Sequence, residues 1–173
     1  EQGVEGYTGT IDTTLDQESP NSDFSSSSSL KVDGDGPSNS SFAKQVLLRF
    51  SDIFGSNPDQ IPPESPISSA WLELLTTNRG SGADLHRMLY EWDESDTWSS
   101  FGGLEASFHT VQDADVSVFD ASFGLTRIEV TKSLMEWSLA PESNFGWAFL
   151  PVGNNRWNFS SSDGGDPPRL VVG

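Results

Sequence analysis

The sequence predicts an all-β fold: a single-domain β-sandwich of the jelly-roll type with one short helix. Short segments that are apolar, or that alternate apolar and polar residues, recur along the 173 residues, and both patterns are typical of strands. Stretches rich in Ser, Gly and Pro separate these segments. No helical pattern of about 10–15 residues lies between them, which argues against a parallel βαβ arrangement. We find no repeat and no long linker, so residues 1–173 are expected to form one module.

The N-terminal half contains the first group of expected strands. Residues 7–15 are rich in Thr and alternate in part, which suits a strand. Residues 45–50 are apolar apart from Arg49 and Gln45, as expected of a buried strand. The strands expected in this half are 7–15, 30–32, 45–50, 67–76 and 84–92.

The C-terminal half contains further strands and the helix. Thr131 is the expected N-cap of a helix over 132–139, and Pro141 would end it. The turn sequence at 153–155, Gly-Asn-Asn, predicts a hairpin between the strands on either side of it. The strands expected in this half are 116–119, 125–130, 147–152, 157–160 and 169–172.

Two tryptophans, Trp92 and Trp98, bracket a run of acidic and hydroxyl residues after an expected strand. An aromatic side chain can bury roughly 150–250 Å², whereas a carboxylate enters a core only when it is paired. We therefore expect the indoles to point inward and the acids to lie at the rim. Arg49 needs a carboxylate partner if it is buried, and Asp93 or Glu94 is the expected partner. Contact between Arg49 and a ligand is the alternative.

The charge of the chain excludes several classes of partner. Lys and Arg number 9 against 26 Asp and Glu, which gives a formal net charge of −17. Such a surface repels nucleic acid and anionic membranes. No apolar run approaches the roughly 20 residues needed to span a bilayer, so no membrane insertion is expected. The chain has no cysteine and therefore no disulfide.

The same excess of acids favours cation binding. Asp33, Asp35 and Asn39 place oxygen donors among glycines, and Ca²⁺ takes oxygen ligands from loops of this kind. These residues are the candidate calcium site, with Ca²⁺ as the expected cofactor. The alternative is a plain solvated turn, because the later bidentate acid of a calcium loop is missing.

Aromatic residues near turns are candidates for stacking against a sugar, because their rings offer flat apolar faces with polar rims. Trp157, beside a turn, is the residue we most expect to be exposed, and burial in the core is the alternative for each tryptophan. Arginines close by could bind a carboxylated sugar. The candidate carbohydrate-binding residues are Trp157, Arg156, Trp147, Tyr90 and Arg87.

An ordered set of short motifs resembles a known family. The set comprises Leu48-Arg49-Phe50, Ser69-Ala70-Trp71-Leu72, Trp92-Asp93-Glu94, Asn144-Phe145-Gly146-Trp147, Ser161-Ser162-Asp163 and Pro168-Arg169-Leu170-Val171-Val172. It resembles the DNRLRE domain family, the disaggregatase-related modules, over residues 7–172. The resemblance implies a β-sandwich jelly roll appended to secreted bacterial or archaeal proteins, in a family that includes alginate-type carbohydrate-binding modules. The basic residues that would bind an anionic polysaccharide are scarce in this chain.

No catalytic motif is present, and the two histidines, His86 and His109, are too far apart to suggest a zinc site. We therefore expect a protein that is not an enzyme. The expected function is that of a non-catalytic module of a secreted, extracellular bacterial protein, which binds polysaccharide and is supported by calcium. The alternative is a structural or adhesive subunit of an extracellular fibre or surface array, whose partners are other copies of itself.

Overall fold

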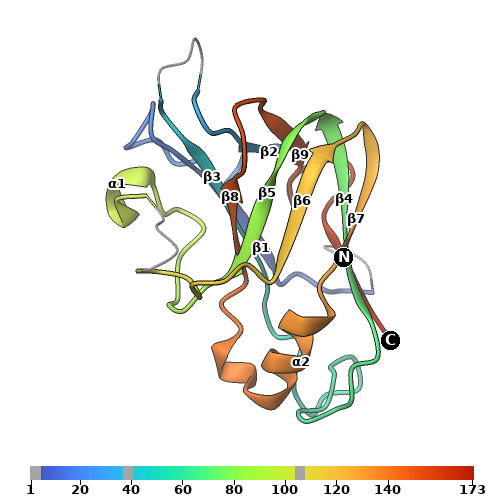
Figure 1. Cartoon of the computed structure of the whole chain (residues 1–173). Coiled ribbons are helices and arrows are strands. Elements are labelled where there is room, and N and C mark those ends of the chain that lie inside the picture. Colours follow the sequence, from blue (N-terminus) through green and yellow to red (C-terminus); the bar gives the residue numbers. More distant parts are fainter. Residues whose placement is uncertain (1–4, 37–40, 104–107) are drawn as a thin grey trace.

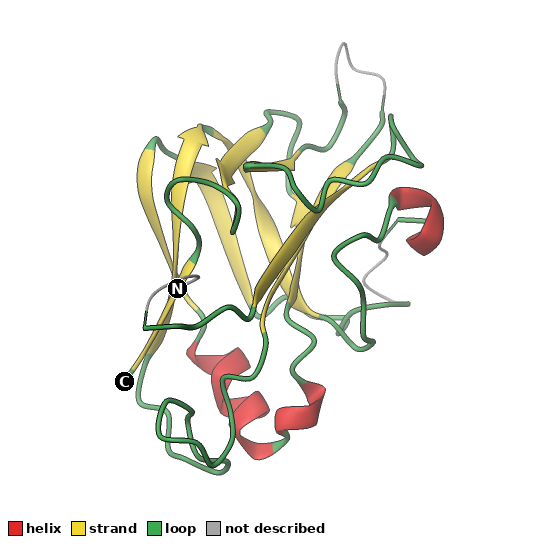
Figure 2. Ribbon diagram, turned by 180° about the vertical axis from the view of Figure 1, so that it is seen from behind, coloured by secondary structure: helices red, strands yellow, loops and turns green. Residues whose placement is uncertain are grey.

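The computed structural model describes residues 5–36, 41–103 and 108–173. Within them, ten strands form two antiparallel five-stranded sheets that pack against each other, which confirms the predicted β-sandwich (Figures 1 and 2). Sheet A contains, in spatial order, β1 (Thr10–Asp16), β3 (Lys44–Phe50), β8 (Trp147–Pro151), β5 (Gly80–Arg87) and β6 (Val116–Ala121). Sheet B contains β2 (Ser29–Val32), β9 (Trp157–Ser160), β4 (Ala70–Asn78), β10 (Arg169–Val172) and β7 (Gly124–Glu129).

Strand β4 is the centre of sheet B. It pairs with β7 along one edge, from Trp71 to Thr76. Because a strand has only two edges, β10 and β9 share the other edge: β10 lies opposite the start of β4 and β9 opposite its end. The strand pairing in sheet B therefore lengthens across the sheet, from four residue pairs between β2 and β9 to six between β4 and β7.

The expected hairpin between 147–152 and 157–160 is wrong. Strand β8 belongs to sheet A and β9 to sheet B, so the connection between them crosses from one sheet to the other. The inward-facing rings explain this arrangement. Phe149 of β8 lies 5.4 Å from Phe159 and 6.2 Å from Trp157, between ring centroids. These large rings are buried between two facing sheets, and the turn residues only join the strands.

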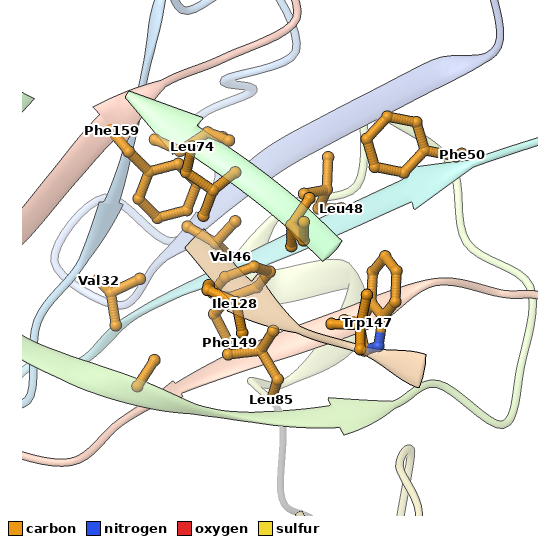
Figure 3. Close-up of a cluster of buried hydrophobic side chains, with 14 of the residues drawn as sticks. Val32, Val46, Leu48, Phe50, Leu74, Leu85, Ile128, Trp147, Phe149 and Phe159 are labelled. Atoms are coloured by element: carbon orange, nitrogen blue, oxygen red, sulfur yellow. The ribbon is translucent and has the colours of Figure 1, made fainter. Parts of the chain in front are cut away.

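The core fills the space between the sheets. Figure 3 shows side chains from both sheets converging there, among them Val46, Leu48, Leu74, Leu85, Ile128, Trp147, Phe149 and Phe159. The alternation seen in the sequence decides which residues enter: in β4, Ala70, Leu72 and Leu74 are fully buried, and the residues between them are not.

A second, smaller apolar cluster covers the outer face of sheet A. It contains Leu15, Leu47, Met88, Trp92 and Ala148, with Trp98 and Phe101 packed against it. The last two belong to α1 (Trp98–Phe101), a single helical turn that the sequence reading missed. The segment from 88 to 103 thus lies on sheet A as a third layer, beside β3 and β8 (Figure 1). This layer explains why nearly every residue of β1 and β3 is buried.

The predicted helix is present as α2 (Thr131–Leu139), followed by the 3₁₀ turn η1 (Pro141–Ser143). Both lie beyond the ends of the strands (Figures 1 and 2). The expected N-cap is wrong, because Val130 occupies that position and provides no side-chain hydrogen bond. The Thr131 hydroxyl instead accepts a hydrogen bond from the Ala70 backbone N–H, at 2.8 Å, and so joins α2 to β4. No helix among the described residues is long and apolar enough to cross a membrane.

Candidate functional site

Two of the tryptophans expected to bind sugar lie in the core. Trp157 and Trp147 are fully buried, so the expectation that Trp157 is exposed is wrong. Each indole N–H donates to an interior hydroxyl: Trp157 to Thr76 Oγ1 and Trp147 to Ser133 Oγ, both at 2.9 Å. A buried indole is stable once its N–H has a hydrogen-bond partner. The sequence alone did not indicate that these two hydroxyls would be the acceptors.

Arg87 is held in a buried network and is not free to bind a sugar. Its Nε lies 2.7 Å from Asp115 Oδ2, and Lys132 Nζ lies 2.9 Å from Asp115 Oδ1. The Ser133 hydroxyl donates to Asp115 Oδ2 at 2.7 Å and accepts from Trp147. The Asp115 side chain is only 1% exposed. Asp115 thus links β5, α2 and β8. Its role could not be predicted from the sequence, because no local pattern distinguishes it from the other loop aspartates.

Arg156 is exposed, but it lies at the other end of β5 from Tyr90. Its carbonyl accepts a hydrogen bond from Asn78 Nδ2 at 2.7 Å, and the neighbouring Asn155 carbonyl accepts from the Ser81 N–H. Both contacts place Arg156 at the Gly80 end of β5. Tyr90 follows the Arg87 end of the same strand, so the structure does not bring Arg156 and Tyr90 together.

The expected ion pair of Arg49 is also wrong. Among the described residues its ion-pair partner is Glu91, with 3.9 Å between Nη1 and Oε1, and the guanidinium lies 5.7 Å from the centre of the Phe145 ring. The Arg49 side chain is 20% exposed and its guanidinium lies over an aromatic face, while its Nε is buried without a hydrogen-bond partner among the described residues. Glu94 is turned away from Arg49, towards the edge of β1.

Glu94 instead belongs to an acidic cluster with Asp12 and Asp163. Glu94 Oε1 accepts a hydrogen bond from the Asp12 N–H at 3.1 Å, and the Ser162 N–H donates to Asp12 Oδ2 at 2.7 Å. Asp12 is 1% exposed. Burial raises its pKa to about 7, and the charges of Glu94 and Asp163 act in the same direction. Within the described residues neither Asp12 nor Glu94 has an ion-pair partner.

The candidate calcium loop is described only in part. Asp33 is nearly buried and accepts a hydrogen bond from the Asp35 N–H at 3.4 Å, and burial raises the pKa of Asp33. Asn39 lies outside the described residues. Across the described ranges no group of three or more His, Asp or Glu side chains is placed to hold a metal ion. Calcium binding stays a prediction.

Of the candidate aromatic residues, Tyr90 is the one that borders a hollow on the surface. This cavity, of about 600 Å³, is called the Tyr90 hollow below; its lining residues are Tyr90, Glu91, Ser100, Phe101, Phe108 and His109. Tyr90 is 58% exposed and Phe108 is 65% exposed. His109 lies between rings, with its centroid 5.3 Å from Phe101 and 6.4 Å from Tyr90.

The Tyr90 hollow is built on anchored backbone. The Leu89 N–H donates to the His109 carbonyl at 2.9 Å, and Met88 pairs with Thr110, so the two sides of the hollow are joined. Below them Trp92 is buried, as predicted, and its indole N–H donates to the Phe145 carbonyl at 2.8 Å. The position of the hollow is therefore fixed on sheet A.

Helix α1 supplies the third side of the hollow. Its capping box holds the turn together: Thr97 Oγ1 accepts from the Ser100 N–H, and Ser100 Oγ accepts from the Thr97 N–H. Phe101 is thereby held against His109. The sequence predicts Tyr90 as a binding residue but not Phe108 and His109. The one feature that could have indicated them is that two adjacent aromatic residues lie outside any expected strand.

The outer surface at β6 and β7 exposes a further apolar patch, made of Phe119, Phe123 and Leu125. These residues belong to β6, to β7 and to the turn that crosses from sheet A to sheet B between them, at the edge opposite β1 and β2 (Figure 1).

Comparison with known proteins adds no family to this geometry. Neither a scan against protein-family models nor a search of curated proteins finds a match. The resemblance to DNRLRE domains stays a prediction.

Proposed function

We propose that this chain is a non-catalytic β-sandwich module that binds polysaccharide through the Tyr90 hollow. The observation that carries the proposal is the pair of exposed rings, Tyr90 and Phe108, at a hollow whose backbone is anchored. Exposed large apolar groups cost solvation free energy, and when they gather around a concavity they mark a binding site. Aromatic faces stack well on the C–H faces of sugar rings because both surfaces are flat and apolar.

The polar groups of the hollow suit a hydroxyl-rich ligand. Glu91 offers acceptor oxygens, and the imidazole of His109 offers one donor and one acceptor when neutral. Such groups at the rim of an aromatic surface fix the orientation of a sugar, while the rings supply most of the contact area. The resemblance to modules of secreted bacterial proteins supports the same proposal and suggests an extracellular location.

Affinity electrophoresis and calorimetry with a panel of neutral and charged polysaccharides test this proposal. Tyr90→Ala and Phe108→Ala should each weaken binding about tenfold or more, which corresponds to about 1.4 kcal/mol. Phe119→Ala is the matched control, because Phe119 is equally exposed, at 68%, but lies in the apolar patch. Retardation by no polysaccharide, or equal losses in all three variants, would contradict the proposal.

Calcium is proposed as a structural support at the loop that begins at Asp33. The support comes from the net charge of −17 and from the oxygen donors of Asp33 and Asp35. Thermal unfolding in Ca²⁺ and in a chelator tests it, since a bound ion raises the unfolding temperature. An Asp33→Asn/Asp35→Asn double variant should lose that rise. If Ca²⁺ raises the unfolding temperature of this variant as much as that of the wild type, the calcium site does not include Asp33 and Asp35.

The alternative function, an adhesive subunit that binds other copies of itself, is favoured by the apolar patch at Phe119, Phe123 and Leu125. Exposed apolar residues beside the edge strands β6 and β7 are a common basis for association. Size-exclusion chromatography over a range of concentrations distinguishes the two functions. Assembly that is abolished by Phe123→Ser would support the adhesive function, and a monomer at all concentrations would count against it.

A further inference from the structure

We propose that the Tyr90 hollow selects polysaccharides that carry positive charge, namely polymers of amino sugars with free ammonium groups. The inference rests on the proposed function and names the class of sugar that the hollow takes. It follows from the charges on the hollow and from the positions of all the cationic side chains in the chain.

The hollow contains an available carboxylate. The Glu91 side chain is 79% exposed and lines the cavity beside Tyr90. Its one ionic contact, with Arg49, is long at 3.9 Å, and Arg49 itself is partly occupied by the face of Phe145. An exposed pair of this length is weak and is easily exchanged for another cation. Glu91 can therefore bind an ammonium group on a sugar.

The Lys and Arg side chains of the chain are not placed to bind an anionic sugar in the Tyr90 hollow. The sequence has 9 Lys and Arg, all of them in the described ranges. Those engaged in ion pairs are Lys44, Arg49, Arg87, Arg127, Lys132 and Arg169. Of the remaining three, Arg79 and Arg156 lie at the Gly80 end of β5 and Lys31 lies in β2. None of the nine lines the Tyr90 hollow.

The rings add to the same preference. The face of an aromatic ring carries partial negative charge and attracts a cation. An ammonium sugar thus stacks its C–H face on one ring while its charge interacts with Glu91 and with the face of the neighbouring ring. A uronate would meet the negative ring face, Glu91 and a net charge of −17, and no Lys or Arg side chain lines the hollow to offset them. The expected order of affinity is amino sugar, then neutral sugar, then uronate.

The test uses three short oligosaccharides of equal length: β-1,4-linked glucosamine, the same backbone fully N-acetylated, and a guluronate oligomer. Calorimetry uses the full chain in a buffer in which the amino groups of the first oligomer are charged. We expect the glucosamine oligomer to bind about tenfold or more tightly than its acetylated form, and the guluronate oligomer not to bind. Added salt should narrow the difference between the first two.

Glu91→Gln is the decisive variant, because it keeps the shape of the side chain and removes its charge. It should abolish most of the preference for the free amine, because it lowers the affinity for the free amine by a much larger factor than the affinity for the acetylated oligomer. Glu142→Gln is the matched control: Glu142 is exposed and belongs to η1, away from the hollow. This variant should keep the preference.

The outcomes separate the inference from the proposed function. Equal affinity for the two glucosamine backbones, both lost in Tyr90→Ala, would overturn the charge preference and leave polysaccharide binding standing. Binding of none of the oligosaccharides would count against both. A preference that survives in a Tyr90→Ala/Phe108→Ala variant, or that an oligolysine of equal charge competes away, would show a general attraction to polycations and overturn the inference.

Discussion

Two buried aspartates in this protein have opposite surroundings. Asp115 lies between the cationic groups of Arg87 and Lys132, at 2.7 and 2.9 Å. Asp12 has backbone N–H groups and other acids around it, and no cation among the described residues. Both side chains are removed from water, yet one carries its charge with full compensation and the other does not. The comparison shows that burial alone does not tell what an acid does for a fold.

The consequence differs for each aspartate. Where cations surround the acid, the charge joins elements that would otherwise be held only by apolar contacts, here β5, α2 and β8. Where the acid is buried with no ion-pair partner among the described residues, as Asp12 is, desolvation makes its charge costly, neighbouring acids add to that cost, and the protonated form is favoured. We therefore expect Asp115 to act as a structural link, and Asp12 to make the stability of the fold depend on pH.

The largest effect is expected for Asp115→Ala. The change leaves Arg87, whose side chain is 18% exposed, without its close partner, and breaking a buried pair on one side costs about 3–5 kcal/mol. Denaturant unfolding measures the loss. Asp113→Ala is the control, because Asp113 is exposed two residues away and should cost less than about 0.5 kcal/mol. Equal stability of the two variants would show that Asp115 is not the link described above.

The next effect concerns Asp12. Its pKa of about 7 lies above the value of 3.8 for a free aspartate, so the folded protein binds a proton that the unfolded chain has released. The free energy of unfolding therefore falls as the pH rises from about 4 to 7 and levels off above that range.

Asp12→Asn resembles the protonated acid and keeps the acceptor for the Ser162 N–H. It should match the wild type near pH 4 and exceed it at pH 8 by about 2–4 kcal/mol. Urea unfolding at a series of pH values measures the difference between the two proteins. A difference that stays constant with pH would mean that Asp12 titrates normally.

A smaller effect is expected for Glu94→Gln. The amide keeps the hydrogen bond to the Asp12 N–H and removes one of the charges that raise the pKa of Asp12. The pKa of Asp12, followed by the NMR shift of its carboxyl carbon, should fall, and the gain in stability should stay below about 1 kcal/mol. Asp59→Asn, at an exposed site outside the cluster, is the control and should leave that pKa unchanged. An increase in the pKa would contradict the described cluster.

The smallest effect is expected for the pair of Arg49 and Glu91. A double-mutant cycle with Arg49→Gln and Glu91→Gln should give a coupling energy below about 0.5 kcal/mol, because the pair is long and Glu91 is exposed. A coupling energy above about 1.5 kcal/mol would show that Arg49 forms a strong ion pair, as Arg87 does with Asp115. It would also weaken the case that Glu91 is available to a ligand.

The fold was predictable from local pattern, but the site was not. Alternation in β4 correctly predicted which side chains face the core, and the indole of Trp92 points inward as expected. The partners of polar side chains could not be predicted because they are distant in the chain: Trp157 donates a hydrogen bond to Thr76, and Arg49 pairs with Glu91. The Tyr90 hollow likewise depends on three segments that meet only on the outer face of sheet A.

The sequence by itself determined the class of fold, the approximate positions of most strands and the deficit of cations, because periodicity and composition are properties of short stretches or of the whole chain. The predicted strand 84–92 was misplaced, since β5 spans Gly80–Arg87. Only the tertiary structure decided that Trp157 is buried while Tyr90 is exposed, that β8 and β9 lie in different sheets, and that Asp115 is compensated while Asp12 is not. Each of these depends on which distant side chain supplies a hydrogen bond, a ring or a charge. That choice is made when the two sheets and the layer over sheet A pack together.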